Sequence, residues 1–295
     1  MSSTLSLTVV KLRKLTYSYA ATNRISYSPA WDKTKQAGRD WYRGFLDRNP
    51  TLSLKTPEAT SLARSSAFNC HIVGTFFNQL TNVCTRYQFP PERIWSIDET
   101  GLTTVHKPAK IIAVKGSKRV GKITSAERGE LVTVCTGINS AGSHIPPYMI
   151  FLRKNWQDRY LSHAPPGSNA TTYPSGWMTY SGFLKFFEHF VRLAQPSLDQ
   201  KHLIVMDNHE SHCSLEAVNY ARDNGIVFLT IPPHTSHKLQ PLDREVFGLL
   251  KTYYSQAASN FMLKFPGRTI TIYDIAELLG DALLQAIAPV NIKVK

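Results

Sequence analysis

Two kinds of hydrophobic pattern occur along the chain, and together they predict strands mixed with helices. Residues 203–206 form the apolar run LIVM, which has no alternation and is typical of a strand buried on both faces of a mostly parallel sheet. Apolar positions recur instead at helical spacing through Phe183, Phe186, Phe187 and Phe190, which predicts an amphipathic helix. The two patterns indicate an α/β fold in which helices flank a mixed sheet.

Other segments extend this sheet and its helices. Strands are predicted for the segments RIWSIDETG, KIIAVKG, ELVTVCTGINSAG, PPYMIFL and IVFLTIPP. Helices are predicted for residues 71–90, for SLEAVNYARDNG, which Ser214 caps and Gly225 ends, and for PLDREVFGLLKTYYSQAASNFML. Pro, Gly and Ser gather between Ser162 and Gly176, where a loop is expected.

The N-terminal part of the chain predicts short helices. Trp41 and Phe45 lie four positions apart, at helical spacing, and Pro50 closes this helix. A second short helix is predicted within LSLKTPEATSLARSSAFN. Basic and aromatic residues on these two helices fit the latter part of a helical DNA-binding module, and a small helical subdomain with solvated charges is the alternative. The chain therefore divides into three parts, which are a poorly patterned segment of residues 1–30, a helical module of residues 31–70 and an α/β domain of residues 90–290.

The net charge of the chain indicates the class of partner that it binds. Its 295 residues carry a formal net charge of +13, and residues 1–97 hold 13 Lys and Arg against 5 Asp and Glu. Lys and Arg gain free energy by releasing counterions from phosphate backbones, so DNA is the expected partner. No run of 18 apolar residues predicts a membrane span, and the four cysteines never form the CxxC spacing of a zinc ribbon.

Acidic side chains follow the apolar runs at three places. Asp98 and Glu99 come after the apolar residues of RIWSIDETG, where we expect the strand to end, and Asp207 follows the run LIVM. Asp243 opens a predicted helix 36 positions after Asp207. Three carboxylates that meet at one edge of a sheet repel one another unless cations neutralise them. Mg²⁺ and Mn²⁺ take oxygen ligands of this kind, and a pair of such ions supports phosphoryl transfer.

A resemblance to a known family rests on short motifs spread over most of the chain. In order, they are SIDETG, AVKGSKRVG, TSAERGELVTV, IPPYMIF, PPGS, PSGWMT, MDNHESH, PPHTSHKLQPLDREVFGLLK and TIYDIAELLG. This series, over residues 90–290, resembles the DDE transposase domain of pogo/Tigger elements, which are DNA transposons of the Tc1/mariner superfamily. Upstream, the segment AGRDWYRGFLDRNPTLSLKTPEATSLARSSAFN resembles the second half of the helix-turn-helix module of the centromere-protein-B type.

The resemblance implies a fold, a site and a reaction. The fold would be ribonuclease H-like, and the catalytic and metal-binding acids would be Asp98, Asp207 and Asp243. The implied cofactor is Mg²⁺ or Mn²⁺ in a two-metal site. The implied function is that of a transposon-derived DNA-binding protein that cleaves DNA and transfers the cut strand in two in-line steps, without a covalent protein–DNA intermediate.

Position and charge in the sequence give further candidate residues and partners. Four polar neighbours are expected to support the acids, and they are Glu99, Asn208, His209 and His237. The residues expected to contact DNA are Arg39, Arg43, Arg48, Lys55, Arg64, Lys118, Arg119 and Lys122. Action on chromosomal DNA implies a nuclear location, and a homodimer stays open.

Two other motifs resemble sites of a different kind. Gly116 to Lys122 has the spacing of a P-loop, but Ile123 stands where a Mg²⁺-binding Ser or Thr is needed. No nucleotide cofactor is therefore expected, and a basic turn against DNA is preferred. His209 and His212 are three positions apart, which is not the four-residue spacing of a zinc-protease helix.

Two alternatives to an active enzyme stay open. Residues 1–29 do not carry the first part of the family's DNA-binding module, so recognition of transposon ends is expected to be impaired. A domesticated, catalytically silent DNA-binding or scaffold protein would keep the fold and lose the chemistry, and a relic open reading frame would have no selected role. The intact acids favour chemistry, whereas the N-terminal difference favours the silent protein.

Overall fold

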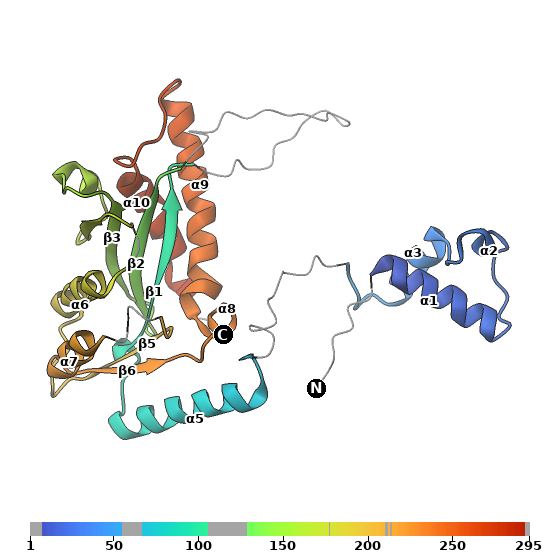
Figure 1. The fold of residues 1–295 in the computed structure, drawn as a ribbon, viewed down its shortest axis with the longest axis horizontal. Helices are drawn as coiled ribbons and strands as arrows, with labels where there is room; N and C mark the ends of the chain where they lie inside the picture. Colours follow the sequence, from blue (N-terminus) through green and yellow to red (C-terminus); the bar gives the residue numbers. More distant parts are fainter. Residues whose placement is uncertain are drawn as a thin grey trace. The chain divides into compact units, whose positions relative to one another are not determined.

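The computed structural model describes residues 8–54, 67–105, 129–176, 178–209, 212 and 214–292. Two compact units make up the chain, Met1–Thr60 and Ser61–Lys295, and each is described by itself (Figure 1). The predicted strand KIIAVKG and the predicted basic turn lie outside the described residues. The same holds for five of the residues expected to contact DNA, which are Lys55, Arg64, Lys118, Arg119 and Lys122.

The N-terminal unit is helical. Its helices are α1 (Val9–Thr22), α2 (Ala30–Thr34) and α3 (Arg39–Arg48). Tyr27 stacks on Trp31 of α2 with 5.5 Å between ring centroids, and Trp41 stacks on Phe45 within α3 at 5.4 Å. The helix predicted around Trp41 and Phe45 is therefore confirmed.

Helix α1 lies within residues 1–30, for which the sequence predicted no element, and the structure corrects that expectation. Ala20 is the buried residue of α1, so the helix leaves no apolar stripe to recognise in the sequence. Hydrogen bonds hold it instead, both at the helix start and to a residue 24 positions away. The Thr8 side chain accepts from the backbone N–H of Lys11 at the helix start, and Nε of Arg13 donates to the carbonyl of Ala37 at 2.6 Å.

The second unit is built on a six-stranded sheet of order β4-β3-β2-β1-β5-β6. The strands are β1 (Ile94–Thr103), β2 (Leu131–Asn139), β3 (His144–Leu152), β4 (Asn169–Tyr173), β5 (His202–Met206) and β6 (Ile226–Thr230). Strand β2 pairs antiparallel with β1 and β3, whereas the pairs β3–β4, β1–β5 and β5–β6 are parallel. This mixed sheet confirms the predicted fold class.

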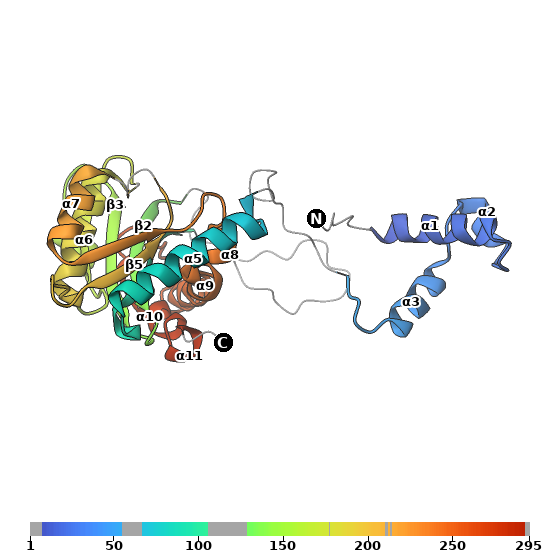
Figure 2. The ribbon, with the colours of Figure 1, turned by 90° about the horizontal axis from the view of Figure 1, so that it is seen from below.

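Helices cover both faces of the sheet (Figure 1, Figure 2). On one face, α6 (Tyr180–Ala194) and α7 (Leu215–Asp223) pack in a core that includes Trp95 and Ile97 of β1. On the other face, α9 (Phe247–Lys264) and α10 (Ile275–Ala286) pack in a core that includes Leu102 of β1. Because side chains alternate along a strand, neighbouring residues of β1 point to different helical layers.

Helix α5 and several short elements complete the second unit. Helix α5 (Cys70–Tyr87) packs through Phe76 against Leu203 of β5 and Leu229 of β6. The remaining elements are η1 (Pro91–Arg93), η2 (Asp158–Leu161), α8 (Ser236–Leu239), the π-helical turn η4 (Leu242–Val246) and α11 (Pro289–Ile292).

The sequence placed most elements of this unit, and β4 is one that it missed. Helix α7 has Ser214 as its N-cap, and Gly225 follows it with a positive φ of 72°, as predicted. Strand β4 lies in the stretch between Ser162 and Gly176 for which a loop was expected. Its five residues, NATTY, are polar and partly exposed, so no apolar run marks the strand in the sequence.

Candidate active site

Strand register brings two of the predicted acids together. Strands β1 and β5 run parallel, and their last paired residues are Ser96 and Val205. Asp98 and Asp207 each follow two positions later, so they fall in the same row of neighbouring strands. Strand β5 then ends, whereas β1 continues along β2. Asp98 therefore lies within its strand, which corrects the expectation that the strand ends there.

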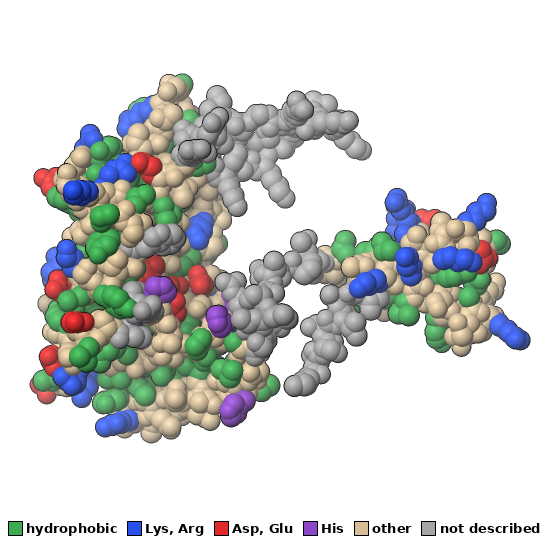
Figure 3. All heavy atoms as spheres, viewed as in Figure 1, with side chains coloured by type: hydrophobic (Ala, Val, Ile, Leu, Met, Phe, Trp, Pro, Cys, Tyr) green, Lys and Arg blue, Asp and Glu red, His purple; other side chains and the backbone are tan. Residues whose placement is uncertain are grey.

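An open pocket of about 500 Å³ lies at this point of the sheet. Its lining residues are Asp98, Glu99, Thr100, Gly101, Leu131, Thr133, Met178, Asp207, His209 and Lys251. Figure 3 shows acidic and histidine side chains close together near the middle of the second unit. The pocket thus combines three carboxylates with the ammonium group of an exposed lysine, Lys251 of α9.

The negative charge of Asp98 is disfavoured in this pocket. Burial, the carboxylate of Glu99 and that of Asp243 raise the pKa of Asp98 to about 8, and Asp207 adds to the effect. The backbone N–H of Glu99 donates a hydrogen bond to Oδ1 of Asp98 at 2.8 Å, which offsets part of the rise. At neutral pH, Asp98 therefore favours a proton unless a cation stands beside it.

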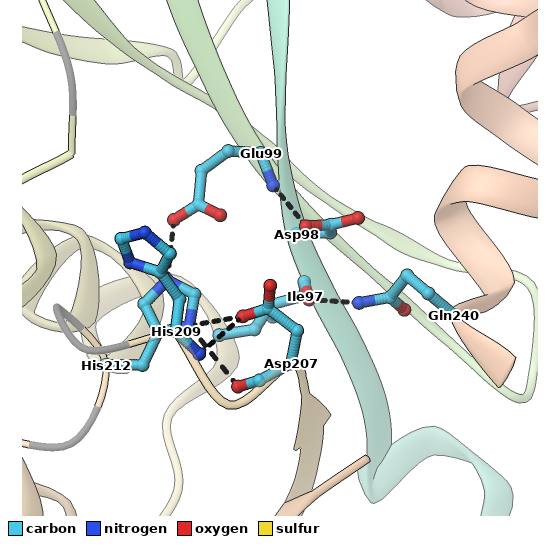
Figure 4. Close-up of polar contacts among 7 residues, drawn as sticks. All are labelled: Ile97, Asp98, Glu99, Asp207, His209, His212 and Gln240. Carbon is cyan, nitrogen blue, oxygen red and sulfur yellow. Dashed lines mark hydrogen bonds and ion pairs between the residues drawn. The ribbon is translucent and has the colours of Figure 1, made fainter. Parts of the chain in front are cut away.

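His212 joins two of the acids (Figure 4). Its Nε2 lies 2.9 Å from Oε1 of Glu99, and its Nδ1 lies 2.8 Å from Oδ1 of Asp207. The ring is buried and stacks on Phe183 of α6 with 4.2 Å between centroids. Burial works to lower the pKa of His212, but the two carboxylates outweigh it and raise the pKa to about 10. His212 is therefore an imidazolium that orients both carboxylates.

Asp243 reaches the same region from the C-terminal part of the chain. It lies in the π-helical turn η4, which precedes α9, and its side chain is exposed. Its charge acts on Asp98, whose pKa it raises, although Asp243 is not among the described residues that line the pocket. Buried Leu242 and Val246 hold η4 in the core. Single π-helical turns of this kind are frequent at functional sites.

The supporting residues expected from the sequence divide into two groups. Glu99 and His209 line the pocket, and the backbone N–H of His209 donates to Oδ1 of Asp207 at 3.1 Å. Asn208 is exposed next to them in the chain. His237 lies on α8 and is not among the described residues that line the pocket.

The described residues expected to contact DNA belong to the N-terminal unit. Arg39, Arg43 and Arg48 lie on α3, and all three are exposed. Arg43 forms an ion pair with Asp40 at 3.4 Å, in which both side chains remain largely exposed. Figure 3 shows Lys and Arg side chains spread over the surface of this unit. Such a surface fits contact with phosphates.

The donor chemistry of the pocket fits a hard divalent cation. Within the described parts of the chain, no three His, Cys, Asp or Glu side chains form a group that is ready to hold a metal ion. The carboxylate oxygens of Asp98 and Asp207 are nevertheless the ligand type that Mg²⁺ and Mn²⁺ take. A cation there would also relieve the repulsion that raises the pKa of Asp98.

Three residues contribute to the site that the sequence analysis missed. They are His212, Gln240, whose Nε2 donates to the carbonyl of Ile97 at 3.0 Å, and Lys251. Lys251 follows Asp243 by eight positions, or about two helical turns, and this spacing could have indicated that it lies on the same side of the helix as Asp243. His212 follows Asp207 by five positions, which is a local signal for that contact, whereas the contacts of His212 with Glu99 and of Gln240 with Ile97 leave none, because they join residues 113 and 143 positions apart.

Carboxylates on adjacent strands of a mixed sheet, with a third acid at the start of a helix, define a ribonuclease H-like core. The chain belongs to the DDE superfamily endonuclease family, whose profile matches residues 129–288. The match includes Asp207 and Asp243 and begins after β1, which carries Asp98. The predicted family is thereby confirmed, while the pogo/Tigger type and the centromere-protein-B type of module stay predictions.

Solved structures of Mos1 transposase share this fold. The pre-cleavage Mos1 transpososome gives a TM-score of 0.52 at 11% identity, covering 92% of this chain and 78% of that chain. The Mos1 transposase paired-end complex with left transposon end gives a TM-score of 0.51 at 11% identity, and the match covers 93% of this chain and 77% of that chain. The Mos1 mariner paired end complex with Mn gives a TM-score of 0.51 at 12% identity, and the match covers 95% of this chain and 79% of that chain. At this level of identity, the likeness is one of fold.

A curated relative is similar over part of the chain. The MFS-type transporter clz9 of Cochliobolus lunatus is 34% identical over 175 residues, which are 58% of this chain and 19% of that protein. The chain thus spans about a fifth of the length of that relative, and the relative's name carries no activity over to it. In the described parts of the chain, every helix is too short or too polar to cross a membrane.

Proposed function

We propose that this chain is a transposon-derived enzyme of the Tc1/mariner, pogo/Tigger type, which cleaves DNA and transfers the cut strand. The observation that carries the proposal is that Asp98 and Asp207 lie in one row of neighbouring strands and line one pocket. The charge of Asp243 also raises the pKa of Asp98. The like charges around Asp98 disfavour its carboxylate in the metal-free protein, and the arrangement of the acids is explained if they bind a cation. The family to which the chain belongs supports DNA as the substrate.

The proposal includes Mg²⁺ or Mn²⁺ in a two-metal site held by Asp98, Asp207 and Asp243. When bound, such a pair would activate the attacking water or 3′-hydroxyl and stabilise the leaving oxygen of an in-line phosphoryl transfer. The Mos1 mariner paired end complex, which is similar in fold, was solved with Mn. Asp98 would serve as a carboxylate in the loaded site, because the cation opposes the charges that raise its pKa.

Other residues of the pocket would orient the acids and the DNA. His212 fixes Asp207 through Nδ1 and is itself fixed by Glu99 and by the ring of Phe183. Asp207 is thereby held in one orientation, which reduces the conformational entropy lost when a ligand binds. The Lys251 ammonium at the same pocket would pair with a phosphate of the substrate.

The N-terminal unit would supply further contacts with DNA. In this proposal, residues 31–70 are a partial helix-turn-helix module whose arginines on α3 bind phosphates, and residues 90–290 are the catalytic domain. A protein that cuts chromosomal DNA acts in the nucleus, and joining two transposon ends calls for a second copy of the chain. Fluorescence microscopy of the tagged chain and light scattering on DNA test these two points.

A catalytically silent DNA-binding or scaffold protein is the second candidate. The observation that favours it is the ion pair between Asp207 and His212, which engages one of the predicted metal ligands. In that case the pocket would keep its acids but bind no cation, and the exposed basic residues of α3 would carry the function.

Thermal unfolding with and without Mn²⁺ separates the two candidates. An enzyme should gain about 1.4 kcal/mol at ten times the dissociation constant of the metal, which raises the melting temperature by roughly 3–5 °C. Asp207→Asn should lose most of this gain, because an amide is a poorer ligand for a hard cation. Asp281→Asn, an exposed change on α10, is the matched control and should respond like the unchanged chain. Melting curves that Mn²⁺ does not shift would contradict the enzyme and support the silent protein.

A further inference from the structure

Gln240 connects the segment of Asp243 to the strand of Asp98. Its Nε2 donates to the carbonyl of Ile97 at 3.0 Å (Figure 4), and its Oε1 accepts from the hydroxyl of Ser96 at 2.5 Å. The residue is only 1% exposed, so both hydrogen bonds are made away from solvent. Breaking either hydrogen bond would leave a buried donor or acceptor unpaired, which costs free energy of folding, so both bonds are expected to persist in the folded protein.

The two ends of this connection lie next to the two acids. Ser96 and Ile97 immediately precede Asp98 on β1, and Gln240 precedes Asp243 by three positions, or about one helical turn. Strand β5 pairs with β1 only as far as Ser96, so Gln240 satisfies the next backbone carbonyl of β1 where a strand partner is no longer present. A short bonded path therefore runs between Asp98 and Asp243.

Apolar packing cannot set this relationship alone. Leu242 and Val246 are buried in the core beside Leu102 of β1, which fixes how deeply η4 sits. Hydrophobic contact is non-directional, so it tolerates sliding of η4 along the strand. The hydrogen bonds of Gln240 are directional and attach to two consecutive residues of β1, so they fix the position along the strand.

We propose that Gln240 is a positioning residue that holds Asp243 in register with Asp98 and thereby sets the affinity of the site for divalent metal. The inference rests on the proposed function. Groups that orient metal ligands typically contribute about 10- to 100-fold to metal affinity. Gln240 acts through the two acids and touches neither the metal nor the substrate.

Calorimetric titration of the full chain with Mn²⁺, without DNA, tests this role. Gln240→Met keeps the length of the side chain and removes both hydrogen bonds, so the dissociation constant of Mn²⁺ should rise by about tenfold or more. Asn139→Leu is the matched control. Asn139 is a buried amide of β2 that donates to the carbonyl of Glu92 at 3.0 Å and accepts from the N–H of Ser143 at 2.8 Å. Its loss should lower the melting temperature similarly and leave the Mn²⁺ affinity unchanged.

Each outcome decides between the hypotheses. Equal Mn²⁺ affinity in Gln240→Met and Asn139→Leu would overturn the role of Gln240 and leave the proposed function standing. An unchanged chain that binds no Mn²⁺ would overturn the proposed function and this inference with it. If Gln240→Met does not fold, Ser96→Ala takes its place, since it removes one of the two hydrogen bonds. A smaller loss of Mn²⁺ affinity in that variant supports the role, and an unchanged affinity contradicts it.

Discussion

Oδ1 of Asp207 lies 2.8 Å from Nδ1 of His212, in a pocket that Asp98 also lines. Although burial opposes it, contact with the carboxylates raises the pKa of His212 to about 10, so Asp207 faces a buried cation. Asp98, in contrast, is buried beside like charges that raise its pKa to about 8. Two acids in one row of the sheet therefore have opposite electrostatic surroundings.

This difference predicts opposite effects of two similar substitutions on the metal-free protein. Asp98→Asn should stabilise it by about 1–2 kcal/mol at pH 7, because a neutral amide enters the pocket without the cost of protonating a carboxylate. Asp207→Asn should destabilise it by about 1–3 kcal/mol, since it leaves His212 with one carboxylate. The effect stays below that of a fully buried pair because the Asp207 side chain is 29% exposed.

Thermal unfolding in the presence of EDTA measures both effects. Asp281→Asn on α10 serves as the control for removal of a surface charge and should change the melting temperature little. If both substitutions in the pocket shifted the melting temperature in the same direction, the account of the two environments would be wrong.

A second prediction concerns pH. His202 of β5 accepts a hydrogen bond from Nε1 of Trp95 at 3.2 Å, and burial, together with the charge of Arg93, lowers its pKa to about 4. The folded state thus favours neutral His202. Its contribution is present above the unfolded pKa of about 6.5 and is lost as the pH falls toward 4.

Unfolding by urea at pH 7 and pH 5 tests this contribution. The unchanged chain should lose about 1–2 kcal/mol more between these pH values than His202→Asn, whose side chain can accept from Trp95 but does not titrate. Equal losses in the two proteins would show that His202 is not the group responsible.

A third prediction concerns the lysine of the pocket. Lys251→Ala should weaken binding of a short DNA duplex and reduce the slope of log affinity against log salt by about one unit, because one phosphate contact is lost. The matched control is Lys264→Ala, which removes an exposed lysine from the last turn of the same helix. Equal slopes for the two variants would place Lys251 outside the DNA path.

The arginines of α3 give a fourth prediction. Replacing Arg39, Arg43 and Arg48 together by Ala should reduce the salt slope by about two to three units, because each lost phosphate contact lowers it by roughly 0.9. Fluorescence anisotropy with labelled duplex over a salt series measures this slope.

A control with the same change of net charge accompanies it. Arg86, Arg192 and Arg222 are exposed in the second unit, and their triple replacement by Ala should affect the slope less. A larger effect in the control would move the main DNA contacts to the catalytic unit.

Local patterns in the sequence were enough to place most of the second unit. Four phenylalanines mark the buried face of α6 because a helix repeats its contacts every three or four residues. The run LIVM marked β5 and thereby the position of Asp207 at its end. These signals are confined to one element, so each can be recognised without knowing its neighbours.

Features that depend on a distant partner could not be predicted in this way. The continuation of β1 past Asp98 follows from its pairing with β2, and β4 exists through its pairing with β3. The contact of His212 with Glu99 joins residues 113 positions apart. Helix α1 was missed because it buries little and leaves no apolar stripe, and one hydrogen bond that holds it joins Arg13 to Ala37, 24 positions away.

Cleavage of an end-labelled duplex tests whether Asp98 and Asp207 support metal-dependent cleavage of DNA. The full chain is incubated with the duplex in Mn²⁺ or in EDTA, and the products are separated on a denaturing gel. We expect strand breaks with 3′-hydroxyl ends in Mn²⁺, none in EDTA, and loss of cleavage in Asp207→Asn but not in Asp281→Asn. Absence of cleavage by the unchanged chain in Mn²⁺, or equal cleavage by Asp207→Asn, would show that these acids do not form a catalytic metal site.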